Sequence, residues 1–102
     1  MLLLPATVTI AEARDTLRML AQAVPREPDT EVTLDASGLT RFDTSALAVL
    51  LKCHRLAQAG GRAFAVRTVP PKLIALAALY GVDTLLFAAT VQTAGNQVDK
   101  GR

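Results

Sequence analysis

The first long periodic segment of the chain predicts an amphipathic helix. Apolar residues recur at helical spacing from Ile10 to Val24, and most charged and amide side chains between them fall on the other side. Thr9 and Glu12 have the spacing of a capping box, in which each side chain accepts a hydrogen bond from the backbone N–H of the other. The pattern therefore predicts a helix that begins after Thr9 and ends before Pro25.

Helical spacing of leucine and alanine returns twice further along the chain. The second predicted helix begins at Asp43 and runs to about Gln58, and Gly60-Gly61 supplies the left-handed stop that commonly follows a helix. The third covers residues 73–80 and ends at Gly81. Both ends are marked by glycine, so these glycines indicate helix termination rather than a phosphate-binding loop.

Alternating and short apolar segments between the helices predict strands. Residues 31–35 and 63–69 alternate in the way of a strand with one buried face, and residues 2–4 are a short apolar run closed by proline. A fourth short segment, 82–87, is predicted to return to the sheet. Strands that alternate with helices predict an α/β fold, with helices packed on a mixed or mostly parallel sheet of about four strands.

The length and composition indicate one small domain with an aliphatic core. The chain has 102 residues, half of them hydrophobic but only 4% aromatic. We assign residues 1–87 to a single domain. Residues 88–102 are polar and lack any periodicity, so we expect them to form a flexible C-terminal tail.

The charge and hydropathy patterns exclude several classes of function. The eleven basic and nine acidic residues are scattered, without the basic stripe and stacking aromatics typical of nucleic-acid binding. The apolar runs 46–51 and 73–80 are far shorter than the roughly 20 residues that cross a bilayer. We therefore predict no direct membrane insertion. The start of the chain has no secretory pattern, and the single Cys53 cannot form an intramolecular disulfide, which predicts a cytoplasmic protein.

The start of the second helix carries the most local information. Asp43 is the predicted N-cap, because its carboxylate can accept a hydrogen bond from a free backbone N–H and lies at the positive end of the helix dipole. Phe42 and Leu47 have the spacing of a hydrophobic staple. We assign Phe42 and Asp43 structural roles that fix where this helix begins.

Two hydroxyls and a wide apolar arc follow this cap. Thr44 and Ser45 lie in the first turn, where they serve either as further capping groups or as part of a phosphate site. Leu47, Ala48 and Leu51 widen the apolar arc beyond what one sheet contact requires. Such an arc indicates either a partner site or a broad core.

No catalytic residue, metal site or cofactor is predicted. The hydroxyls of the first turn would need a base within reach, and the only histidine, His54, lies about three turns along the same helix. We place His54 on the solvent-facing flank and interpret Cys53 as a small buried residue, since no second metal ligand accompanies it. Nucleotide-binding glycine motifs are absent from the sequence.

The segments Val32–Leu39 and Phe42–Leu51 together resemble the central signature of STAS domains, a strand and short turn followed by an aspartate, small hydroxyl residues and a leucine-rich helix. The order of the remaining elements extends this resemblance over residues 2–87. It implies a SpoIIAA-like fold and a non-enzymatic interaction domain.

The resemblance implies two possible functions. MlaB-like proteins bind the MlaF-like ATPase of an MlaFEDB-type ABC transporter for phospholipids. In these proteins the residue after the aspartate is implicated in the ATPase contact, and the corresponding residue here is Thr44. Such a protein helps to maintain outer-membrane lipid asymmetry and lies at the inner membrane through its partner.

In anti-sigma-factor antagonists, a partner kinase phosphorylates the serine two places after the aspartate, which corresponds to Ser45. The short chain and the Asp43-Thr44 pair favour the MlaB-like interpretation, with Thr44, Ser45, Leu47, Ala48 and Leu51 as partner-binding residues.

Overall fold

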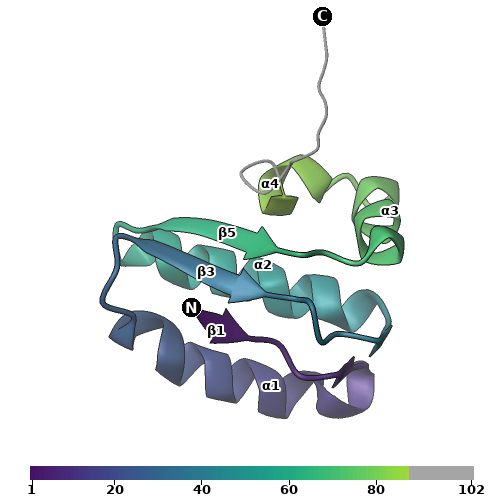
Figure 1. Ribbon diagram of the computed structural model, residues 1–102, viewed down its shortest axis with the longest axis horizontal. Helices are drawn as coiled ribbons and strands as arrows, with labels where there is room; N and C mark the ends of the chain where they lie inside the picture. Colours follow the sequence, from purple (N-terminus) through teal and green to yellow (C-terminus); the bar gives the residue numbers. More distant parts are fainter. Residues whose placement is uncertain (88–102) are drawn as a thin grey trace, which may run out of the picture.

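The computed structural model describes residues 1–87, and these form parallel strands with helices packed on them (Figure 1). The alternation of strands and helices in the sequence is thus confirmed as an α/β fold. In chain order the elements are β1 (Leu2–Leu3), β2 (Thr7–Val8), α1 (Ile10–Ala23), a short 3-10 helix η1 (Val24–Arg26), β3 (Glu31–Asp35), β4 (Arg41–Phe42), α2 (Thr44–Ala59), β5 (Ala63–Arg67), α3 (Pro71–Leu79) and α4 (Asp83–Phe87).

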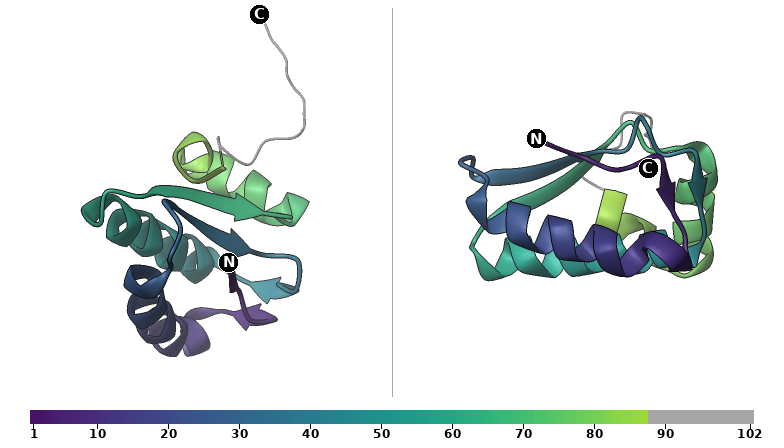
Figure 2. Two further views of the ribbon diagram at one scale, coloured as in Figure 1. Left: turned by 60° about the vertical axis from the view of Figure 1, so that its left-hand side comes forward. Right: turned by 90° about the horizontal axis from the view of Figure 1, so that it is seen from below.

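The larger sheet is all parallel, with strand order β1-β3-β5. Val32 pairs with Phe64 and Leu34 with Val66, so these four side chains point to one face of the sheet, and all four are buried. Helices α1 and α2 lie side by side against this face (Figure 2). The predicted single buried face is therefore confirmed in β3, whereas in β5 the intervening Ala65 is buried as well, so this strand does not have a single buried face.

A second, two-stranded parallel ladder joins β2 to β4, with Thr7 beside Arg41 and Val8 beside Phe42. The sequence analysis did not find these strands, because two residues are too few to show an alternating pattern. Each strand directly precedes a helix. The ladder therefore holds the start of α1 next to the start of α2.

The segment 82–87 is a helix, α4, and the prediction that it returns to the sheet is wrong. Gly81, at φ +73°, ends α3 as predicted, and the chain then turns into a new helix whose Leu86 and Phe87 are buried beside β5. A short apolar run between turn signals fits a buried strand and a buried helix equally well. The predicted flexible tail, 88–102, lies outside the described residues.

The predicted helix ends agree closely with the structure. The Thr9–Glu12 capping box is present, with the Thr9 N–H donating to Glu12 Oε1 at 2.8 Å. At the end of α2 the left-handed residue is Gly61, at φ +71°, whereas Gly60 keeps a negative φ of −90°. Only one glycine of the pair is therefore required by backbone geometry.

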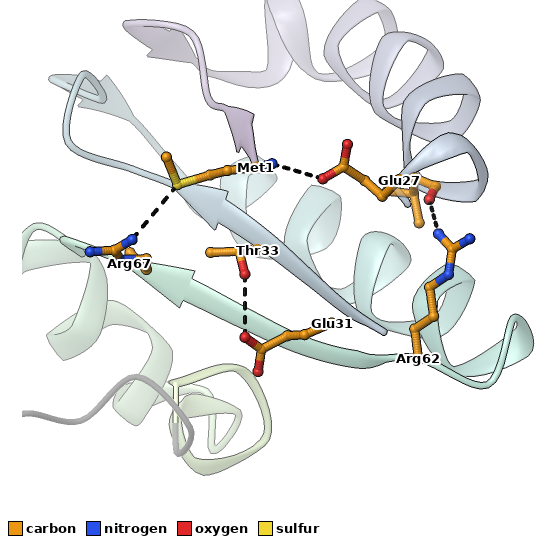
Figure 3. Close-up of polar contacts among 7 residues, drawn as sticks. Met1, Glu27, Glu31, Thr33, Arg62 and Arg67 are labelled. Atoms are coloured by element: carbon orange, nitrogen blue, oxygen red, sulfur yellow. Dashed lines mark hydrogen bonds and ion pairs between the residues drawn. The ribbon is translucent and has the colours of Figure 1, made fainter. Parts of the chain in front are cut away.

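Polar contacts tie the connection between α1 and β3 to the neighbouring strands (Figure 3). The ammonium group of Met1 pairs with Glu27 Oε1 at 2.9 Å. Arg62, the residue before β5, donates to the backbone carbonyl of Val24 at 2.6 Å and to that of Pro25 at 3.1 Å. These contacts hold η1 against both edges of the larger sheet.

Candidate functional site

The carboxylate of Asp43 bridges the starts of two helices. Asp43 lies just before α2 in extended conformation, and its Oδ1 accepts a hydrogen bond from the backbone N–H of Ser45 at 2.8 Å, which confirms the predicted cap. Its Oδ2 accepts a second bond from the backbone N–H of Ile10, the first residue of α1, at 3.1 Å. Sequence reasoning missed this second bond, because it depends on the β2–β4 ladder.

Hydrogen bonding keeps the carboxylates at these helix starts ionised. The pKa of Asp43 lies below its usual value, chiefly because the Ser45 N–H donates to it and further because the Ile10 N–H does. The pKa of Glu12 is lowered in the same way by hydrogen bonds from the side chain and backbone of Thr9. Each helix thus carries a negative charge at the positive end of its dipole.

The predicted partner-binding residues divide between surface and core. Thr44 and Ala48 are exposed, and Ser45 and Leu51 are half-buried. Leu47 is only 4% exposed and belongs to the core, so it cannot form part of a docking surface. For Leu47 the broad-core interpretation is therefore right and the partner-site interpretation is wrong. Phe42, the predicted staple partner of Leu47, also packs against the core.

The outward side of α2 forms a continuous exposed stripe. Thr44, Ala48, Lys52 and Arg55 follow one another at spacings of four, four and three residues, so they share one side of the helix, and all four are exposed. The opposite side packs into the core through Ala46, Val49, Leu50, Cys53 and Ala57. We call the four exposed residues the α2 stripe.

An exposed isoleucine lies next to the start of this stripe. The side chain of Ile10 is 80% exposed, although its spacing in the sequence assigned it to the inner side of α1. That assignment is wrong because Ile10 is the first helical residue and does not pack against the sheet. The hydrogen bond from its backbone N–H to the Asp43 carboxylate places Ile10 beside the first turn of α2. The sequence signal that could have indicated this is its position directly after the Thr9 cap.

The other candidate chemical groups are packed rather than available. Burial raises the pKa of the Cys53 thiol to about 11, as expected of a structural rather than a reactive cysteine. His54, predicted to face solvent, is half-buried, and its ring packs edge-on against Phe64 with centroids 5.5 Å apart. Among residues 1–87, no group of three or more His, Cys, Asp or Glu side chains could hold a metal ion.

The geometry is thus that of an exposed, hydrogen-bonded helix start on an α/β scaffold. A family model described as "Mlab, STAS domain" matches residues 2–88. The chain belongs to the STAS domain family. No curated protein matches it. STAS domains are generally non-enzymatic interaction domains. Within the described part of the chain, no helix is both long and apolar enough to span a bilayer.

Proposed function

We propose that this STAS domain binds the ATPase subunit of an MlaFEDB-type ABC phospholipid transporter, and that it stabilises or activates that subunit on the cytoplasmic side of the inner membrane. The observation that carries the proposal is the exposed Thr44, which the Asp43 cap holds in the first turn of α2. The description of the matching family, which names Mlab, agrees with it.

The mechanism is binding without turnover. The β2–β4 ladder and the two hydrogen bonds of Asp43 fix both helix starts before any partner arrives, so little conformational freedom is lost on docking. The small side chain of Ala48 allows a partner to approach the helix closely. A domain that binds only the folded ATPase raises its stability by an amount that grows logarithmically with the ratio of free domain concentration to Kd, which is how an accessory subunit stabilises an enzyme.

Replacing Thr44 by alanine is expected to weaken binding to the ATPase about tenfold, because a hydroxyl and a methyl group are lost from the contact. Alanine favours helix, so the fold should be unchanged. Binding is measured by calorimetric titration of the purified ATPase subunit, and ATPase activity is measured with and without the domain. Thr84→Ala, at an exposed position in α4, is the matched control. A domain that changes neither activity nor assembly of the transporter would exclude the proposal.

A second function, antagonism of an anti-sigma factor, is suggested by the position of Ser45. Its backbone N–H donates to Asp43, so a phosphate on Ser45 would add close to two negative charges beside that carboxylate. Such a change would repel a partner. Thr44 is exposed whereas Ser45 is half-buried, and this difference supports the ATPase-binding role instead.

We expect Ser45 to be unmodified in the native protein, and Ser45→Asp to leave binding of any anti-sigma factor unchanged. Phosphopeptide mass spectrometry of the protein from its own cells tests the first expectation, and pull-down with the Ser45→Asp variant tests the second. A phosphorylated Ser45, together with loss of a kinase or anti-sigma partner in the variant, would replace the ATPase-binding proposal by the antagonist function.

A further inference from the structure

The α2 stripe ends in two basic residues that have no acidic partner within residues 1–87. Lys52 and Arg55 are both exposed, and the sixteen residues of α2 include no aspartate or glutamate. The ion pairs in this part of the chain are elsewhere, between the Met1 ammonium and Glu27 and between Arg18 and Asp15.

The two cations are also neighbours of each other. Residues three apart on a helix lie next to one another on its surface, and like charges at this spacing destabilise the helix. No acidic side chain in α2 offsets this repulsion. Carboxylates on a docked partner would offset it, and the exposed position of both side chains leaves them accessible to such a partner.

We propose that the α2 stripe docks against a protein surface that presents carboxylates to Lys52 and Arg55 and an apolar contact to Ile10. This inference rests on the proposed function and specifies the chemistry of the ATPase surface that the domain binds. At the rise of an α-helix, Lys52 lies about 12 Å and Arg55 about 16 Å from Thr44 along the axis. The surface is therefore apolar and hydroxyl-bearing at one end and basic at the other, which fixes the orientation of the partner.

Other anionic partners fit this surface less well. A phospholipid surface is bound by clusters of about four to eight basic residues, and a nucleic acid by a basic stripe with stacking aromatics. The stripe offers two cations, flanked by the half-buried Leu51 and preceded by Ala48. Two cations beside small and apolar side chains match the polar rim and apolar centre of a protein interface.

Exposed charges at such a rim act mainly on the rate of association and on its salt dependence. The test is titration of the purified cognate ATPase subunit with the domain at several salt concentrations, comparing the wild type with K52E/R55E. The variant keeps two like charges at the same spacing, so repulsion within α2 is retained. The control is R26E/K72E, which makes the same change in net charge at exposed positions in η1 and α3.

The expected result is binding at least about tenfold weaker for K52E/R55E, with a smaller loss of affinity on adding salt than in the wild type, and a change within about twofold for the control. Equal affinity of K52E/R55E and wild type would overturn this inference and leave the proposed function standing. Absence of wild-type binding at every salt concentration would overturn the proposed function, and the inference with it.

A second measurement uses the unmodified proteins and does not depend on how well a variant folds. Carbodiimide couples a lysine amine to a carboxylate only where the two are in contact. In the wild-type complex we expect Lys52 to be coupled to an aspartate or glutamate of the ATPase, as identified by mass spectrometry. Lys72, exposed on α3, should remain uncoupled. Coupling of Lys72 with none at Lys52 would overturn the inference.

Discussion

Replacing Leu50 by alanine is expected to lower the free energy of unfolding by about 2–5 kcal/mol, the range for truncating a fully buried leucine. Leu50 is 1% exposed and lies in the middle of the side of α2 that faces the core. Since small domains are stable by only about 5–15 kcal/mol, this loss is a large fraction of the total. Urea unfolding followed by circular dichroism measures it.

The matched control is Leu79→Ala, the same truncation at a helical leucine that is 78% exposed. We expect it to change stability by less than about 0.5 kcal/mol. Under conditions where Leu50→Ala remains folded, it should still bind the ATPase, because Thr44 and Ala48 lie on the opposite side of α2. If Leu50→Ala and Leu79→Ala lowered the free energy of unfolding equally, the division of α2 into an inner side and a docking side would be contradicted.

Local signals in the sequence were sufficient for most of the fold. The Thr9–Glu12 box, the Asp43 cap and the glycines after α2 and α3 act within a few residues of themselves, so their effects can be predicted without knowing the rest of the chain. The same holds for the alternation in β3, where each second residue is buried.

Long-range pairing could not be predicted in this way. The β2–β4 ladder joins residues more than thirty positions apart through strands of only two residues, and no local pattern encodes it. The bond between Asp43 and Ile10 follows from that ladder. The sequence placed Ile10 on the wrong side of its helix and left Leu47 open between a partner site and the core for a related reason, since burial near a helix start depends on which distant segment lies beside it.

The candidate site was predicted in part. Thr44 and Ala48 follow from the cap and the helical period, and the structure places both on the exposed side. In the sequence alone, Lys52 and Arg55 fall outside the inner apolar side of the second helix, which indicates only a solvated side. Their continuity with Thr44 and the lack of an acidic neighbour in α2 support the proposed contact with a partner's carboxylates. An outward position alone does not suggest such a contact.

Replacing Asp43 by alanine is expected to lower the melting temperature by about 5–10 °C, because two backbone donors, those of Ser45 and Ile10, lose their acceptor at once. The starts of α1 and α2 would lose a direct link, so ATPase binding should fall as well. Asp43→Asn is the informative control, since asparagine caps helices nearly as well as aspartate and keeps an acceptor oxygen. We expect it to recover most of the lost melting temperature. If the melting temperature of Asp43→Asn were as low as that of Asp43→Ala, the stabilisation by Asp43 could not be assigned to hydrogen bonding.

The same carboxylate makes stability depend on pH in a defined direction. Because the pKa of Asp43 is lower in the folded state than its usual value of about 4, its contribution is present above that value and is lost as the pH falls through the folded-state pKa. The fall in melting temperature on acidification below about pH 4 should therefore be shallower in Asp43→Asn, which has no group to protonate at this position. If the melting temperatures of Asp43→Asn and the wild type fell equally steeply with decreasing pH, the cap would not contribute to acid sensitivity.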